Sequence, residues 1–363
     1  IEDGLHTRFY PDGKRRSESN FKDGVKQGRE LLFYDNGQVE ENSTYQKGIL
    51  NDKQFGFYEG GSSRYVNNWN NGKLNGVSKG WYSNGQKEYA NYWMEDKLMN
   101  AKRWQPNGAV CALTDLADGD GVNVAYFLNG KKSSIEVFKG GILNGTSISY
   151  YESGAYMSKV IYKEGVRDGQ EILYYENGRV KQEAHYSKNR LHGESRVYFE
   201  NGNLEAVENF RNGQIHGQDI AYSSDGTKIS DTSYSNGLKH GRELIYFKTG
   251  EVKMDANYSE GQLHGESRLY FENEKLATVE NFRNGKKYGL DIDYSSDGRK
   301  TIEVNYRNNL KQGREVLYHA NGQVKQDANY SEDLLHGECR VYFENGALAT
   351  VEYFVDGKKH GRD

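Results

Sequence analysis

The chain has 363 residues, of which 35% are hydrophobic, and it contains 43 Gly, 29 Tyr and only 2 Pro. This composition cannot fill several thick hydrophobic cores, while the many aromatic rings argue against a disordered chain. The net charge of -4, without a basic run, argues against nucleic-acid binding, and no segment approaches the roughly 18 apolar residues of a membrane span.

The start of the chain and its cysteines say little about its location. The chain begins at Ile1 rather than Met and shows no signal-like apolar stretch, so we expect a processed form or a fragment. A cell-surface or extracellular location and a cytoplasmic one are both compatible with the sequence. Cys111 and Cys339 lie far apart, so we expect no disulfide between them.

A 24-residue period runs along the chain, and a glycine opens most of the units. The unit of residues 100–120 is irregular and shorter, and all the others keep the same length. We therefore expect one repeat array over residues 1–363, with about fifteen units. The first position of successive units is occupied by Gly4, Gly28, Asp52, Gly76, Asn100, Gly121, Gly145, Gly169, Gly193, Gly217, Gly241, Gly265, Gly289, Gly313, Gly337 and Gly361.

Three further columns repeat in step with this glycine, which is counted as position 1. Position 10 is usually Gly after Asn or Asp, as in Gly178 and Gly202, and Glu274 breaks the column. Positions 6 and 18 are aromatic in almost every unit. Position 6 includes Phe9, Phe33, Phe57, Trp81, Tyr126, Tyr150, Tyr174, Tyr198, Tyr222, Tyr246, Tyr270, Tyr294, Tyr318 and Tyr342; position 18 includes Phe21, Tyr45, Trp69, Trp93, Phe138, Tyr162, Tyr186, Phe210, Tyr234, Tyr258, Phe282, Tyr306, Tyr330 and Phe354.

One unit shows what this pattern predicts. Residues 171–175 are rich in strand formers, and residues 179–186 read as the returning strand. Between them, Glu176-Asn177-Gly178 predicts a tight hairpin turn, because Asn and Gly tolerate positive φ. Residues 187–192 predict a second turn that leads into the next unit. Helix is disfavoured because a Gly or an Asn-Gly pair interrupts every short segment of the unit.

Because one hairpin cannot bury its own face, the hairpins must stack side by side. The fold class expected is all-β: an elongated, twisted antiparallel meander, similar to a solenoid, built from 24-residue β-hairpins. We expect the aromatic columns to lie on one face, and the sheet to curl until that face closes into a narrow core. Residues 193–363 carry a longer, 72-residue period, which indicates duplication of three units at a time.

The repeat resembles a known family. The run Tyr258-Ser259-Glu260-Gly261-Gln262-Leu263-His264-Gly265 is similar to the MORN repeat, and Tyr198-Phe199-Glu200-Asn201-Gly202 with the 24-residue length resembles the bacterial MORN variant. Proteins of that group are often described as antitoxin components. The resemblance covers the whole chain and implies scaffolds, protein-binding surfaces or membrane-associated adaptors, and it supplies no catalytic motif.

A histidine column precedes the opening glycine and is the first candidate site. A shared metal would need ligands about 2 Å from one ion, whereas neighbouring members are expected to lie about 10 Å apart. We therefore expect these side chains to shape or cap the turn, and we expect no metal site. The column consists of His192, His216, His240, His264, His336 and His360.

Two other patterns have simple explanations. Asp115, Asp118 and Asp120 are spaced somewhat like a calcium loop, but flanking helices and a closing Glu are missing, so a loop that absorbs the shorter unit explains them better. Asn-x-Ser/Thr sequons are explained by chance in a chain rich in Asn and Ser. They begin at Asn42, Asn144, Asn257 and Asn329.

The residue patterns favour a binding protein over an enzyme. Most carboxylates recur in every triplet, and neither a nucleophile–base constellation nor a phosphate loop stands out, so we expect no catalytic residues and no cofactor. Surplus aromatic residues such as Tyr175 and Phe199 are candidates for an outer binding surface.

We therefore expect a non-enzymatic structural or protein-interaction scaffold, which could belong to a longer array or filament. It would bind a protein partner, or associate with itself through its terminal strands. The alternatives are an antitoxin that binds a partner toxin, with residues 100–120 as the unusual patch, and a glycan or cell-surface binding module.

Overall fold

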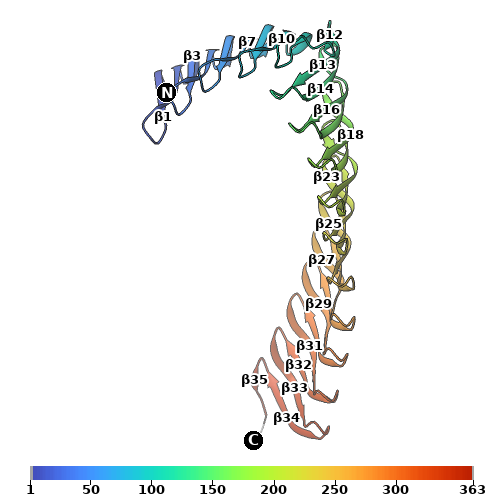
Figure 1. The fold of residues 1–363 in the computed structure, drawn as a ribbon. Coiled ribbons are helices and arrows are strands. Elements are labelled where there is room, and N and C mark those ends of the chain that lie inside the picture. Colours follow the sequence, from blue (N-terminus) through green and yellow to red (C-terminus); the bar gives the residue numbers. More distant parts are fainter. Residues whose placement is uncertain (1–2, 362–363) are drawn as a thin grey trace. The chain divides into compact units, whose positions relative to one another are not determined.

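The computed structural model describes residues 3–361, and within them the fold is all-β with antiparallel hairpins throughout (Figure 1). The chain divides into two compact units, residues 1–190 and 191–363. In each unit the strands follow one another in chain order and pair with their sequence neighbours, as β18 with β19 and β23 with β24. The open hairpin meander expected from the 24-residue period is confirmed.

In residues 3–190 the strands are β1 (Gly4–Phe9), β2 (Arg15–Lys22), β3 (Val25–Phe33), β4 (Val39–Gln46), β5 (Ile49–Leu50), β6 (Asp52–Phe57), β7 (Ser63–Asn70), β8 (Lys73–Leu74), β9 (Gly76–Trp81), β10 (Lys87–Met94), β11 (Lys97–Arg103), β12 (Asp115–Ala117), β13 (Asp120–Tyr126), β14 (Lys132–Lys139), β15 (Ile142–Leu143), β16 (Gly145–Tyr150), β17 (Tyr156–Lys163), β18 (Val166–Tyr174) and β19 (Val180–Ser187).

From residue 190 onward the strands are β20 (Arg190–Leu191), β21 (Gly193–Tyr198), β22 (Leu204–Arg211), β23 (Gln214–Tyr222), β24 (Lys228–Ser235), β25 (Leu238–Tyr246), β26 (Val252–Ser259), β27 (Gln262–Tyr270), β28 (Leu276–Arg283), β29 (Lys286–Tyr294), β30 (Lys300–Arg307), β31 (Leu310–Tyr318), β32 (Val324–Ser331), β33 (Leu334–Tyr342), β34 (Leu348–Val355) and β35 (Lys358–Lys359).

The Asn-Gly turn between the two strands of a unit follows the sequence expectation only in part. Gly178 has a φ of 85°, but Asn177 is not in the positive-φ region. Asn177 contributes its side chain instead, because its Oδ1 accepts a hydrogen bond of 3.0 Å from the backbone N–H of Arg179. This is the Asx geometry of a three-residue hairpin loop, with Gly in the left-handed position.

The second turn, between units, has positive φ at both central residues. In one example the φ values are 54° at Asn212 and 85° at Gly213. Positive φ at both positions defines the type I′ hairpin, which matches the twist of the strands. Its second residue also donates to the preceding unit: Gly213 N–H bonds the carbonyl of Leu191 at 2.8 Å. These turns therefore link successive units as well as reversing the chain.

The glycine that opens each unit lies in a bulge. Along β22 and β23, Glu208 pairs with Asp219 and Phe210 with Ile215, so Asn209 alone faces the segment 216–218. Gly217 has a φ of 107° there, a region that glycine adopts without strain. The Asn209 amide donates to the carbonyl of Gln218 at 3.1 Å. The 24-residue glycine column is therefore a column of bulges.

The two aromatic columns lie on opposite faces of the sheet, so the expected closure of one aromatic face into a narrow core is wrong. Tyr186 pairs with Gly169, and Tyr174 lies five positions beyond Gly169 on the same strand. Since side chains alternate across a strand, Tyr174 and Tyr186 point to opposite sides. The register of the hairpin decides this, and the residue types alone do not.

The most buried line of side chains consists of positions 3 and 16, here called the central row. Its members pair across many strand boundaries, as Glu243 does with Ala256 and Ala256 with Ser267. Many members are polar, which is unusual for buried positions. The row explains how a chain poor in Leu, Ile and Val forms a stable sheet: small and acidic residues fill its middle. Buried members are Ser19, Glu30, Ser43, Ser78, Asn91, Asn123, Val160, Glu171, Ala184, Ser195, Thr232, Glu243, Ala256, Ser267, Asp291, Val304, Glu315, Ala328 and Cys339.

The irregular unit of residues 100–120 contains a local hydrophobic core. Cys111, Val124 and Tyr126 are 3%, 2% and 8% exposed, and they pack together. Thr114 Oγ1 accepts a hydrogen bond from the backbone N–H of Val124 at 3.1 Å and holds the loop against β13. In the shorter unit, this packing therefore holds the chain between β11 and β13 in place where other units have a regular hairpin.

Candidate binding surface

Buried carboxylates of the central row are neutralised by a basic residue at position 23 of the preceding unit. Lys239 forms an ion pair with Glu243, and its ammonium also lies 5.0 Å from the ring centre of Tyr258. Burial, with the hydrogen bond to Glu243, raises the pKa of Tyr258 to about 12. Within residues 3–361 the same cation–carboxylate–tyrosine cluster occurs five times: Lys26, Glu30 and Tyr45; Arg167, Glu171 and Tyr186; Lys239, Glu243 and Tyr258; Lys287, Asp291 and Tyr306; and Lys311, Glu315 and Tyr330.

The opposite face carries arginine–carboxylate pairs that recur with the 72-residue period, and it is here called the arginine face. Arg242 binds Asp255 through two hydrogen bonds of 2.8 Å, and Arg314 binds Asp327 through two of 2.9 Å. Bidentate pairs of this kind are among the stronger polar contacts. Hydrogen bonding to Arg242 outweighs burial and lowers the pKa of Asp255. Both guanidinium-bearing side chains remain largely exposed, at 59% and 60%.

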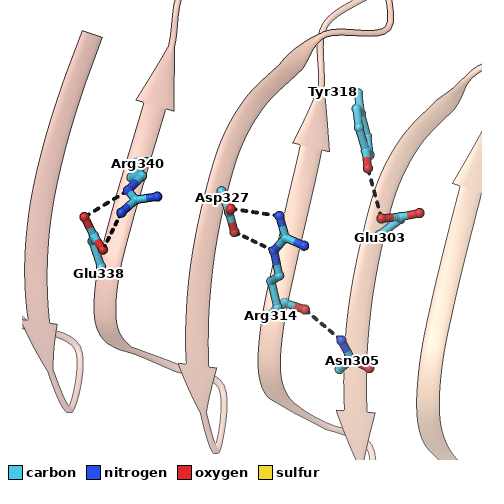
Figure 2. Close-up of polar contacts among 7 residues, drawn as sticks. All are labelled: Glu303, Asn305, Arg314, Tyr318, Asp327, Glu338 and Arg340. Carbon is cyan, nitrogen blue, oxygen red and sulfur yellow. Dashed lines mark hydrogen bonds and ion pairs between the residues drawn. The ribbon is translucent and has the colours of Figure 1, made fainter. Parts of the chain in front are cut away.

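Figure 2 shows how these pairs lie on neighbouring strands of the arginine face. Arg340 binds Glu338 through two hydrogen bonds of 2.9 Å within β33, and Tyr318 donates to Glu303 at 2.9 Å. The face therefore presents alternating guanidinium, carboxylate and phenol groups in fixed positions. Ordered groups of this kind suit recognition of another protein, because few side chains must be immobilised on binding.

The surplus aromatic residues at position 7 do not form the free outer surface that the sequence suggested. Tyr175 and Phe199 are half-buried, and Lys181 lies 5.7 Å from the ring centre of Tyr175. Several equivalent tyrosines donate a hydrogen bond to the next unit, as Tyr34 does to the carbonyl of Phe57 at 2.8 Å. This column therefore serves cohesion between units. Its recurrence in unit after unit is a signal that could have predicted this role.

Asparagine at position 9 forms a second ladder along the hairpin tips. Asn201 donates to the carbonyl of Ser224 at 2.7 Å, and Asn273 donates to the carbonyl of Ser296 at 2.8 Å. The side-chain oxygen of such an asparagine also accepts a hydrogen bond within its own turn, as Asn201 Oδ1 does from the backbone N–H of Asn203. The Asn-Gly pattern therefore encodes both the turn and its link to the next turn.

The histidines precede the bulge glycines and reach the turn of the following unit. His216 Nδ1 accepts a hydrogen bond of 3.4 Å from the backbone N–H of Asn236, and His264 contacts Asn284 at 3.2 Å. His336 contacts Asp356 at 3.3 Å. These contacts agree with the expected turn-shaping role. No group of three His, Cys, Asp or Glu residues within 3–361 is arranged to hold a metal ion.

The three aspartates of the irregular unit lie in a hairpin, not in the loop that the sequence suggested. Asp115 belongs to β12, and Asp118 has a φ of 53° in the turn before β13. Asp120 accepts a hydrogen bond of 2.7 Å from the backbone N–H of Gly140. The chain that absorbs the shortening lies earlier, between β11 and β12. The aspartates therefore organise turns.

The two cysteines are buried and free, in different surroundings. Burial opposes ionisation of Cys111, but hydrogen bonds with Tyr126 and Thr114 outweigh it and lower its pKa. Burial, followed by the charge of Glu352, raises the pKa of Cys339. Two of the sequon asparagines are used in the sheet: Asn257 donates to the carbonyl of Glu266 at 3.3 Å, and Asn42 accepts from Arg29 at 3.0 Å.

These contacts define a class of protein: an open β-hairpin repeat protein, in which recurring polar side chains connect one repeat to the next. Within residues 3–361 no helix could cross a membrane.

The MORN repeat variant family matches the chain at eight positions, so the chain contains repeats of this type. The matched segments are residues 2–23, 26–47, 143–164, 167–188, 191–212, 263–284, 311–332 and 335–356. No curated protein matches the chain.

Similarity to solved structures is low. A crystal structure of TcdB2-TccC3 is 11% identical and covers 97% of this chain, with a TM-score of 0.17. A structure of the Photorhabdus luminescens Tc holotoxin pore is 13% identical and covers 96%, with a TM-score of 0.15. This chain spans 27% and 18% of those two chains. Scores at this level carry no argument about fold or function.

Proposed function

We propose that this protein is a non-enzymatic scaffold that binds a protein partner through the arginine face. The observation that carries the proposal is the repetition of one ordered group of side chains: Arg242 with Asp255, and Arg314 with Asp327, at equivalent positions of successive 72-residue copies. Repeated copies of one surface raise the overall affinity for a partner that offers repeated contacts. The polar groups at the turns and in the central row are used for cohesion, which leaves this face for recognition.

The test is affinity capture from the source organism with the full chain and with the double variant Arg242→Ser, Arg314→Ser. A partner of the arginine face should be retained by the unmodified chain and lost from the variant. Lys325→Gln is a matched control, because Lys325 is exposed on the same β32 strand as Asp327 but outside the paired set. A partner retained equally by all three proteins would place binding elsewhere and contradict the proposal.

The two alternatives predict different partners. The antitoxin function rests on the family resemblance and requires a stable complex with a toxin, so a toxin gene beside this gene would favour it. A glycan-binding function rests on exposed tyrosines, such as Tyr156 at 42% and Tyr92 at 44%. Binding to a glycan array, lost on substitution of these rings, would favour that alternative.

Self-association through terminal strands is a separate proposal. Unpaired strand edges are templates for further pairing. Size-exclusion chromatography with light scattering over a range of concentrations tests it. A growing mass would support end-to-end assembly, and a constant monomer mass at high concentration would contradict it.

A further inference from the structure

Two neighbouring type I′ turns, at Asn284-Gly285 and Asn308-Asn309, border an open basic concavity of about 400 Å³. It is lined by Arg283, Asn284, Lys286, Tyr288, Arg307 and Asn308. Arg283 and Arg307 both occupy position 19 of successive units, at the ends of β28 and β30. Lys286 opens β29 between them. Three cationic side chains from three consecutive strands therefore line one open hollow.

The three cations have no carboxylate partner among the described residues. Within residues 3–361 no ion pair is formed by Arg283, Lys286 or Arg307, and Glu260 and Glu332, at the turn position of flanking units, form none either. Arg283 lies 5.6 Å from the ring centre of Tyr288. Lys287, the residue beside Lys286, behaves differently and binds both Glu280 and Asp291. Apart from the ring of Tyr288, the positive charge of the three cations is therefore offset only by solvent or by an anionic ligand.

We propose that this concavity binds a phosphomonoester, either as a small molecule or as a phosphorylated side chain. A phosphomonoester carries a charge of about -1.5 to -2 and three terminal oxygens. Two guanidinium forks and one ammonium can serve these oxygens, and the fork geometry of arginine matches phosphate. A carboxylate offers one charge and two oxygens, which leaves the cations less well neutralised. The site does not depend on the proposed role of the arginine face.

The preceding 72-residue copy provides an internal comparison. The residues equivalent to Arg283, Lys286, Tyr288 and Arg307 are Arg211, Gln214, His216 and Ser235. Only one of the three cations is retained there, on closely similar strands. The two copies therefore have a common backbone frame, and they differ in the groups that would hold the anion.

Isothermal titration calorimetry of the full chain tests the proposal with two probes, glycerol 3-phosphate and a phosphoserine-containing glycine peptide. We expect one site, with binding that weakens as salt rises. Lys286→Gln with Arg307→Ser, which copies the preceding unit, should weaken it by about tenfold or more, since it removes two of the three charged hydrogen-bond donors. Arg211→Ser, which removes an equivalent cation outside the concavity, should leave the affinity within about twofold.

Binding of both probes with similar affinity would show that the phosphoryl group alone is recognised. Binding of only one would identify the source as a small molecule or as a phosphorylated chain. No binding of either probe, or equal loss in the Arg211→Ser control, would overturn the proposal.

A gain-of-function variant keeps the test independent of any loss of stability. Gln214→Lys with Ser235→Arg and His216→Tyr rebuilds the same groups in the preceding copy. We expect the number of sites to rise from one to two. An unchanged stoichiometry, with the first site intact, would show that these side chains do not make a phosphate site and would overturn the proposal.

Discussion

Residues 193–264 and 265–336 are two copies of one 72-residue sequence, but they treat the same pair of carboxylates differently. In the first copy Glu208 pairs directly with Asp219 across β22 and β23. The residue at position 23 is Ile215, and within the described chain neither carboxylate forms an ion pair. In the second copy, the equivalent Glu280 and Asp291 both bind Lys287, at 2.6 and 3.0 Å.

Burial raises the pKa of the equivalent aspartate in both copies, and the opposing contacts differ. Burial, followed by the charge of Asp219, raises the pKa of Glu208. Burial, followed by the charge of Asp231, raises the pKa of Asp219, although Lys239 opposes the shift. In the second copy burial also raises the pKa of Asp291, against the hydrogen bonds from Asn281 and Lys287. Burial alone would lower the pKa of Lys287, but its bonds to both carboxylates outweigh burial and raise that pKa.

In this comparison the side chains at equivalent positions differ more than the backbone that carries them. Both copies have corresponding strand bounds, positive-φ turns and a glycine bulge, although the ladder is interrupted after Glu208 in the first copy and after Val279 in the second. The strands and turns therefore form with or without the lysine. We expect local stability and pH response, in contrast, to depend on the residue at position 23.

The largest effect is expected from Lys287→Ile, which gives the second copy the arrangement of the first. It leaves Glu280 and Asp291 close together without a cation, so the free energy of unfolding should fall by about 2–3 kcal/mol. Denaturation of the full chain, with local hydrogen exchange at β28 and β29, measures it. Lys286→Gln at the neighbouring exposed position is the control, and an equal loss there would contradict the role of Lys287.

A smaller and equal effect is expected when the bulge glycine is replaced in each copy. Gly217 and Gly289 have φ values of 107° and 103°, and an added Cβ would lie 3.3 and 3.6 Å from Asn209 and Asn281. Gly217→Ala and Gly289→Ala should each cost about 1–2 kcal/mol, because alanine is strained at this φ. Thermal or chemical unfolding checks this. Clearly unequal costs would show that the backbones of the two copies differ.

Ile215→Lys should stabilise the first copy by about 1 kcal/mol at neutral pH, because it supplies the missing cation to Glu208 and Asp219. Slower hydrogen exchange in β22 and β23 would be the direct sign. Ile215→Leu, which keeps an apolar side chain of the same size, is the matched control. No gain with lysine, or the same gain with leucine, would contradict the account.

The same pair predicts a pH dependence with a definite sign. The ordinary pKa values are 4.5 for Glu208 and 3.8 for Asp219, and both are raised in the folded chain. A carboxyl with a raised folded pKa stabilises the fold while it is protonated. This contribution is therefore present below about pH 4 and is lost as the pH rises through the raised values. Exchange rates in β22 and β23 from acid to neutral pH should show the loss, and Ile215→Lys should reduce it.

The smallest effect is expected at the hairpin tips, where both copies have the asparagine bond to the next turn but differ at Gly202 and Glu274. Asn201→Ala and Asn273→Ala each remove one bond to the next turn, so each should cost about 0.5–1 kcal/mol. Because the carbonyl of Ser224 also accepts a hydrogen bond of 2.8 Å from Asn203, the loss at Asn201 should be the smaller of the two. Parallel denaturation of both variants tests this, and no loss for Asn273→Ala would contradict a role of the tip bonds in stability.

Much of the fold could be predicted from the sequence, because turn residues recur with a fixed period. The Gly column, the Asn-Gly pairs and the second turn at residues such as Asn212-Gly213 determine the hairpins directly. The placement of Tyr174 and Tyr186 on opposite faces could not be predicted in the same way. It follows from the cross-strand register, and each hairpin contains a bulge that shifts it.

The candidate sites could be predicted from the sequence to different degrees. The Lys239–Glu243 cluster could have been found in the sequence, because a basic residue at position 23 accompanies an acidic residue at position 3 of the next unit in five places. The basic concavity required the structure, since Arg283 and Arg307 belong to successive units and meet only when adjacent turns are packed side by side. Histidine can serve as a metal ligand, but the contacts of the histidine column organise turns.

The most direct test of the central claim is hydrogen exchange of the double variant Ile215→Lys, Lys287→Ile, compared with the unmodified chain. If position 23 sets local stability on a common backbone, protection should rise in β22 and β23 and fall in β28 and β29, so that the two copies exchange their behaviour. Unchanged protection in both copies, or a change of the same sign in both, would contradict the account.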